Sequence, residues 1–154
     1  MFTKSAPTKP RATQAVNPNS FWSLAHNLTS LTEDERLSRI SAGFEVSWLV
    51  ATRAAFNVTG PVLAHLANLS KSTVERRIKG QAALDPVASE RIDRLAQVAV
   101  MAEGVFEDKA LAAAWMTKVN DALGGKTPLS LCNTELGARQ VRRVLHAIEW
   151  GGVA

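Results

Sequence analysis

The side chains best suited to a chemical task lie between positions 71 and 79, where hydroxyl and basic residues alternate with apolar ones. Serine and threonine hydroxyls and arginine guanidinium groups can hydrogen-bond to base edges and phosphates of DNA. Val74 and Ile78 are four residues apart, so a helix would turn both toward a core and leave the polar side chains outside. The candidate DNA-contacting residues are Lys71, Ser72, Thr73, Glu75, Arg76, Arg77 and Lys79.

Two short helices joined by a polar turn are expected to position these side chains. Thr59 is suited to cap the first helix, with Pro61 in its first turn. The second is expected to begin at Ser72, with a capping box between Ser72 and Glu75, and to end at Gly80. We favour this capping role for Glu75 over a contact with cytosine. The apolar face expected for the first helix contains Val62, Leu63 and Leu66.

This pair of helices is typical of a helix-turn-helix, whose second helix enters the major groove. The alternative is an ordinary helical hairpin with a solvated basic face. The net charge of +4 and the isoelectric point near 9.6 suit an anionic partner, although both values are modest.

Composition predicts a globular protein of the cytoplasm. The chain has 154 residues, of which 46% are hydrophobic, and these can bury a core. Its one cysteine, Cys132, excludes an internal disulfide framework. No apolar run approaches the ~20 residues of a membrane span, and the amino terminus lacks the apolar segment of a signal peptide. Residues 1–30 read as a flexible basic arm, which Phe21 and Trp22 anchor to the body.

The remaining periodic segments predict further helices. A capping box of Thr32 and Glu35 begins a helix that should end near Gly43. A second helix is expected over 45–56, with Trp48, Leu49, Thr52 and Phe56 on its buried side. A third helix is expected to begin at Asp85 and Pro86 and to continue until Gly104 loosens the chain. A fourth is expected over 108–123, and a further one begins at Thr127 and Pro128.

An apolar stripe along the helix that starts at Asp85 is expected to pack inside the chain and also to form a dimer interface. Helix-turn-helix proteins usually bind DNA as two-fold dimers. The stripe contains Ala88, Ile92, Leu95, Ala99, Ala102 and Phe106. In the helix over 108–123, the apolar side chains are Leu111, Trp115 and Val119.

The last helix is expected over 138–150 and is strongly amphipathic. Its apolar positions follow the i, i+3, i+4, i+7 pattern of a packed face: Val141, Val144, Leu145 and Ile148. Arg139, Arg142, Arg143 and His146 lie on the other side. Arginine and aromatic residues are enriched in protein interfaces, so this face is a candidate interface. The alternative is that it is a solvated helix face.

Several motifs resemble those of one known family. Trp115, the Gly-Gly-x-Thr-Pro turn at 124–128, the Thr-Glu-x-Gly step at 134–137 and the Ile-Glu-aromatic-Gly ending at 148–151 resemble the toxin-binding domain of the Xre/MbcA/ParS antitoxins. Residues 72–77 resemble the Thr-x-x-Arg-Arg stretch of the family's helix-turn-helix. The resemblance covers about residues 43–151, and its carboxy-terminal half is the more specific part.

The resemblance implies an antitoxin encoded beside a RES-domain toxin that degrades NAD. It implies that the carboxy-terminal domain obstructs the toxin's active site, that the helix-turn-helix represses the operon, and that homodimers assemble with toxin into a larger complex. No cofactor is implied, and Trp115 and the Gly-Gly turn are read as structural. The residues expected to contact the toxin are Arg139, Arg142, Arg143, His146, Glu149 and Trp150.

The sequence thus predicts an all-α protein in three parts: an arm at 1–30, a helix-turn-helix domain at 31–103 and a small helical toxin-binding domain at 104–154. A helix-turn-helix transcription regulator without a toxin partner is the alternative. An enzyme is the weakest reading, because no carboxylate pair or metal-ligand spacing is present. His26, His65 and His146 fall on different elements.

Overall fold

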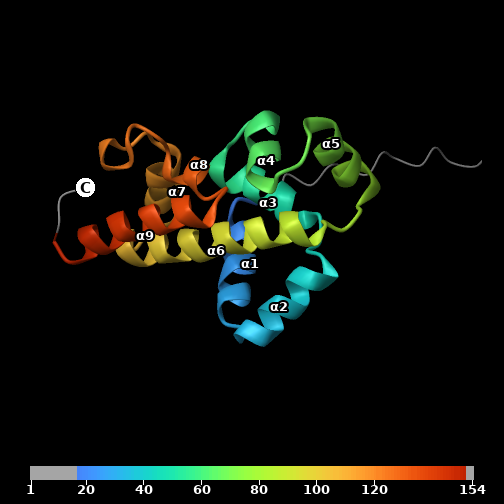
Figure 1. Ribbon diagram of the computed structural model, residues 1–154, viewed down its shortest axis with the longest axis horizontal. Coiled ribbons are helices and arrows are strands. Elements are labelled where there is room, and N and C mark those ends of the chain that lie inside the picture. Colours follow the sequence, from blue (N-terminus) through green and yellow to red (C-terminus); the bar gives the residue numbers. More distant parts are fainter. Residues whose placement is uncertain (1–16, 152–154) are drawn as a thin grey trace, which may run out of the picture.

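The computed structural model describes residues 17–151, and within that range the chain forms nine α-helices and one 3-10 turn (Figure 1). The predicted all-α fold is confirmed. None of these helices is both long and apolar enough to cross a bilayer. The elements are α1 (Asn19–Thr29), α2 (Glu33–Ala42), α3 (Ser47–Phe56), α4 (Gly60–Ala67), α5 (Lys71–Gly80), α6 (Pro86–Phe106), α7 (Lys109–Thr117), η1 (Asp121–Leu123), α8 (Pro128–Leu131) and α9 (Glu135–Glu149).

The 21-residue helix α6 runs through the centre of the molecule and packs against α1, α2, α4, α7 and α9. As predicted, Asp85 caps it, accepting a hydrogen bond from the Ala88 backbone N–H at 2.7 Å. The expected loosening at Gly104 is wrong, because the helix continues to Phe106 and ends where Glu107 takes a φ of 56°.

The apolar stripe of α6 is buried inside the chain, with Phe106 partly buried at its end. Ala88, Ile92, Ala99 and Ala102 have no exposed surface, and Leu95 has almost none. The expectation that this stripe also forms a dimer interface is therefore wrong, since all of its side chains except Phe106 have almost no surface left to offer a second copy.

Helix α1 corrects the predicted extent of the arm. Residues 19–29 are helical, and Phe21 and Trp22 are core side chains. The Phe21 ring makes edge-to-face contacts with Trp48 and Phe56 at centroid distances of 5.9 and 5.0 Å. The sequence gives little warning of this helix, because Pro18 at its start supplies no side-chain cap. Residues 1–16 of the predicted arm lie outside the described residues.

Helices α2 and α3 form largely where the sequence predicts. The Thr32 and Glu35 capping box is present, and Gly43 ends α2 with a φ of 90°. Trp48, Leu49, Thr52 and Phe56 of α3 are all buried. Helix α2 itself has no buried residue. It is held to α6 by the Arg36 guanidinium, which donates two hydrogen bonds to the Asp93 carboxylate at 3.0 and 2.7 Å.

The helix expected over 108–123 is shorter than predicted. Helix α7 ends at Thr117, where Lys118 turns to extended backbone. The Asn120 backbone N–H donates to the Lys126 carbonyl at 3.0 Å, and the Asn120 side chain caps η1. The buried side of α7 contains Ala112 and Met116, whereas Leu111 and Val119 are exposed and Trp115 is half-buried.

The last helix begins three residues earlier than predicted. Thr134 accepts a hydrogen bond from the Gly137 backbone N–H, so α9 starts at Glu135. Gly137 passes so close to the Leu131 carbonyl that a Cβ there would lie 2.0 Å from its oxygen. The predicted cap at Thr127 and helix start at Pro128 are confirmed for α8.

Candidate functional site

Helices α4 and α5 form the predicted helix-turn-helix. Thr59 caps α4, and Asn68 ends it in the left-handed conformation. Leu63 and Leu66 of α4 are buried, as is Val74 of α5, and these side chains fix the packing of the two helices. The predicted apolar face is wrong for Val62, which is exposed.

The cap of α5 differs from the prediction. Ser70 rather than Ser72 caps the helix, accepting from the Thr73 backbone N–H at 3.1 Å. The Ser70 and Thr73 hydroxyls also lie 2.7 Å apart. Glu75 therefore has no capping role, and its carboxylate lies 3.6 Å from the Arg53 guanidinium of α3.

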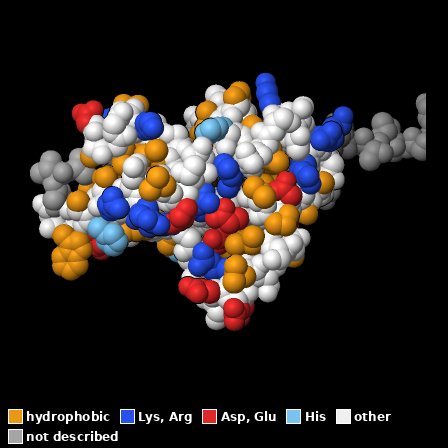
Figure 2. Space-filling view, in the orientation of Figure 1, with side chains coloured by type: hydrophobic (Ala, Val, Ile, Leu, Met, Phe, Trp, Pro, Cys, Tyr) orange, Lys and Arg blue, Asp and Glu red, His pale blue; other side chains and the backbone are white. Residues whose placement is uncertain are grey.

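Most of the candidate DNA-contacting side chains are on the outside of α5. Lys71, Ser72, Glu75, Arg76 and Lys79 are exposed, and Thr73 is half-buried. Figure 2 shows basic side chains over this end of the molecule. The Arg76 guanidinium lies within 3.4 Å of the Thr73 hydroxyl on the preceding turn.

Arg77 is an exception among these residues, and the prediction that it faces outward is wrong. Its side chain is half-buried and its guanidinium donates a hydrogen bond to the Ala83 carbonyl. The contact ties the end of α5 to the segment that leads into α6. Arg77 therefore stabilises the turn that follows α5, while Arg76 on the same helix is exposed.

The second candidate surface is the outer face of α9. Val141 and Leu145 are fully buried, while Val144 and Ile148 are partly buried. Figure 2 shows basic and histidine side chains along this helix. Trp150, just after the helix, is 85% exposed. Of the residues expected to contact toxin, the exposed ones are Arg139, Arg143, His146, Glu149 and Trp150.

Arg142 differs from the other predicted toxin-contacting residues because it is half-buried. Its guanidinium donates to the Glu135 carboxylate at 2.8 Å, across the first two turns of α9. This hydrogen bond, opposed by partial burial, lowers the pKa of the Glu135 carboxyl below its ordinary value. Arg142 thus fixes the start of α9.

A groove of about 480 Å³ lies between α9 and the turn after η1. Lys126 reaches it from the turn, and Gln140, Arg143 and Val144 reach it from α9. Lys126 was not among the predicted contact residues, although the Gly-Gly turn that carries it was noted. The two cations and the amide suit an acidic side chain of a partner.

Polar contacts join the segment between α8 and α9 to α6 and to α4 of the helix-turn-helix. Arg94 of α6 donates to the Cys132 carbonyl at 3.2 Å and to Glu90 at 2.8 and 2.7 Å. The His65 ring of α4 lies 2.8 Å from the Asn133 amide. Sequence reasoning missed these residues. The i, i+4 spacing of Glu90 and Arg94 predicts their pairing, but nothing local predicts the contacts between elements.

The described residues offer no metal site: between positions 17 and 151 no three His, Cys, Asp or Glu side chains gather closely enough to hold an ion. Cys132 is buried, and burial raises the pKa of its thiol to about 12. The thiol is therefore protonated at neutral pH and poorly suited to nucleophilic chemistry.

Comparisons with known proteins match the two regions of the chain that contain these surfaces. Residues 35–97 match the antitoxin Xre-like helix-turn-helix domain, and residues 101–151 match the antitoxin Xre/MbcA/ParS C-terminal toxin-binding domain. The chain is 31% identical to Antitoxin Xre of Pseudomonas putida, over 74% of this chain and 70% of that relative. The chain belongs to the Xre/MbcA/ParS antitoxin family.

The chain is also similar to other proteins that are named antitoxins. It is 33% identical to Antitoxin Xre of Photorhabdus laumondii over 60% of this chain and 63% of the relative. It is 28% identical to a Sphingobium protein named Prs ADP-ribosylating antitoxin, over 78% of this chain and 81% of the relative. The chain is an antitoxin with a helix-turn-helix DNA-binding domain and a toxin-binding domain.

Proposed function

We propose that this antitoxin neutralises a RES-domain toxin that degrades NAD, and that it represses its own operon. The observation that carries the proposal is the separation of two exposed basic surfaces. Helix α5 lies at one end of α6 and the outer face of α9 extends toward the other end (Figure 1). Toxin and DNA would then bind to different surfaces of one chain.

For DNA, the exposed residues of α5 are the proposed contacts. Arg76 and Ser72, exposed in the first turns of the helix, would reach base edges, and the exposed Lys71 and Lys79 would reach phosphates. A homodimer would place two such helices on successive half-sites. Its interface would have to lie outside the buried stripe of α6.

For the toxin, the proposed contacts are the exposed side chains of α9. Arg139, Arg143 and Trp150 combine charge with a large apolar surface, a pairing typical of residues that dominate binding energy. We propose simple occlusion of the toxin's active site, since the exposed face of α9 presents arginines rather than an acidic cluster that could imitate a phosphate. Deleting residues 149–154 should weaken neutralisation while the fold is retained, and full neutralisation by the truncated chain would contradict occlusion.

The name of the Sphingobium relative favours a second candidate for the toxin's reaction. That name joins an antitoxin to the ADP-ribosylation of Prs. A toxin that transfers ADP-ribose to a protein and one that hydrolyses NAD would both consume NAD. The two are distinguished by following whether labelled ADP-ribose becomes attached to Prs or is released into solution.

The first experiment is co-purification with the product of the adjacent gene, followed by NAD-consumption assays with and without this antitoxin. We expect stable co-elution and loss of NAD consumption. Operator binding without any association with that gene product would favour the alternative, a helix-turn-helix regulator without a toxin partner.

A further inference from the structure

Helix α7 has a composition unlike that of a surface helix. Between Lys109 and Lys118 its residues are Ala-Leu-Ala-Ala-Ala-Trp-Met-Thr, with no charged side chain. A surface helix normally has one apolar and one polar face, and a helix that is apolar all round is normally buried all round. In α7 only one side is covered by other residues of the described range, 17–151.

The covered side of α7 contains Ala112 and Met116, which are fully buried. The other side contains Leu111, Ala114 and Trp115, which share a face because they are three and four residues apart. Leu111 is 58% exposed and Ala114 is exposed. Trp115 is half-buried, with its ring centroid 5.6 Å from that of Phe106. Val119, just beyond the helix, is 64% exposed.

We propose that this face, formed by Leu111, Ala114, Trp115 and Val119, is a second toxin-contacting surface, distinct from the outer face of α9. It lies within the residues 101–151 that match the toxin-binding domain. The inference rests on the proposed function, because its partner is the same toxin. Four of the seven large exposed apolar side chains of the described chain lie within residues 101–151: Leu111, Val119, Leu136 and Trp150.

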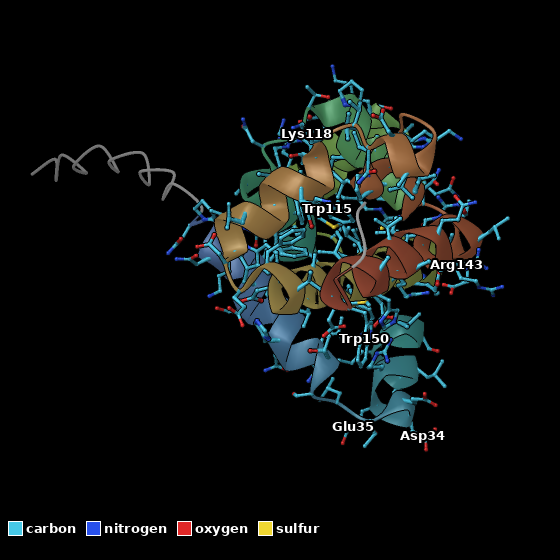
Figure 3. All side chains as sticks on the ribbon, turned by 90° about the vertical axis from the view of Figure 1, so that its left-hand side faces the viewer. Asp34, Glu35, Trp115, Lys118, Arg143 and Trp150 are labelled. Carbon is cyan, nitrogen blue, oxygen red and sulfur yellow. The ribbon has the colours of Figure 1, made fainter. Side chains whose placement is uncertain are left out.

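The chemistry of the α7 face identifies the kind of surface it contacts. Its side chains are aliphatic or aromatic, whereas α9 offers Arg139 and Arg143. A charged nucleotide-binding cleft would suit the arginines but not Leu111. The α7 face therefore binds an apolar part of the toxin outside its active site. Figure 1 shows α7 and α9 at the same end of the molecule, and Figure 3 labels Trp115 and Trp150 in a view of that end, so one toxin can span both.

This division gives the two surfaces different signatures in an inhibition assay. Loss of an α7 contact lowers affinity but leaves the occluding residues in place, so saturating antitoxin still abolishes NAD consumption. Loss of residues 149–154 leaves residual consumption even at saturation. The α7 face thus supplies affinity, and the end of α9 supplies inhibition.

The test compares Leu111→Asp with Leu37→Asp in the full chain, using the co-purified toxin as the binding partner. Leu37 on α2 is 60% exposed, which makes it a matched control. We expect Leu111→Asp to raise the Kd for toxin on the order of tenfold or more, and still to give complete inhibition at saturation. An unchanged Kd, an equal effect of Leu37→Asp, or residual NAD consumption at saturation would overturn the proposal.

A labelling experiment covers the case in which Leu111→Asp fails to fold. Leu111→Cys and Leu37→Cys are each treated with a thiol reagent, since native Cys132 is buried. We expect toxin to protect position 111 and not position 37. Protection of position 111 without toxin, rising with antitoxin concentration, would instead identify a second copy of this chain as the occupant.

The outcomes separate this inference from the proposed function. Toxin binding that is weakened by Arg143→Glu but not by Leu111→Asp would overturn the α7 surface and leave the proposed function standing. Absence of binding by the unsubstituted chain would overturn both.

Discussion

Arg76 and Arg77 are neighbours in the sequence, but their guanidinium groups have different surroundings. Arg76 is exposed on the outer side of α5, and Arg77 is half-buried and donates to the Ala83 carbonyl. The sequence presents them as an identical pair. Only the position of the segment after α5, which is set by tertiary packing, distinguishes a residue that faces solvent from one that fixes the fold.

Substituting each arginine separately should therefore have different effects. Arg76→Ala should weaken operator binding by about 1–3 kcal/mol, because a base contact is lost, without changing thermal stability. Arg77→Ala should lower the free energy of unfolding by about 1–2 kcal/mol, through the lost charge-assisted hydrogen bond. Electrophoretic mobility shifts at several salt concentrations and urea unfolding measure the two effects. A loss of stability in Arg76→Ala but not in Arg77→Ala would contradict the assignment.

Two glycines within helices should respond in opposite directions to alanine. At Gly137 a Cβ would lie 2.0 Å from the Leu131 carbonyl oxygen, whereas at Gly104 it meets nothing within 4 Å. Gly137→Ala should destabilise the chain by about 1–3 kcal/mol, because α9 must move away from α8. Gly104→Ala should stabilise it by roughly 0.5–1 kcal/mol through helix propensity. Thermal unfolding of both variants checks the pair, and equal shifts in Tm would refute the close approach.

At the scale of elements, the helices with explicit start signals were predictable. Thr32, Thr59, Asp85 and Thr127 each cap the helix that the sequence assigns to them. Helix α1 lacks such a cap and was missed. The buried face of α7 could not be predicted for another reason: a run of apolar residues has no polar side to define which face turns inward.

Helix α2 projects from the body, with Asp34 and Glu35 at its tip (Figure 3). Since it buries no residue, its attachment depends strongly on the ion pair between Arg36 and Asp93. Asp93 is almost fully buried and Arg36 is 24% exposed at its side chain. The hydrogen bond to Asp93 outweighs partial burial and raises the pKa of the Arg36 guanidinium.

Breaking this pair should detach α2 before the rest of the chain unfolds. Asp93→Ala should cost roughly 2–3 kcal/mol, less than a fully buried pair because Arg36 keeps some contact with water. Amide hydrogen exchange should show α2 losing protection while α6 keeps most of its own. Asp34→Ala, on the same helix but exposed, is the control and should change stability by less than about 0.5 kcal/mol. Equal loss of protection in α2 and α6 would show that the pair does not act locally.

At the scale of the whole molecule, the two matched regions are parts of one packed unit. The predicted boundary between residues 103 and 104 falls inside α6, and both α7 and α9 pack on that helix together with α1 and α4. Arg94 and the contact between His65 and Asn133 add polar links between the halves. Motifs could separate the two functions along the sequence, but they carry no information on the helix that the regions share.

This shared core predicts a single cooperative unfolding transition rather than one for each region. The buried side chains of the described residues form one continuous cluster from Phe21 in α1 to Leu145 in α9. Unfolding either half exposes apolar surface of the other, so partly folded states should be scarcely populated. Calorimetry of the full chain should give a ratio of calorimetric to van't Hoff enthalpy near one.

A fragment of residues 1–103 should lack a cooperative transition, because removing α7 and α9 uncovers the side of α6 on which they pack. Two resolved transitions, or a fragment that unfolds cooperatively, would mean that the helix-turn-helix is stable without the toxin-binding region.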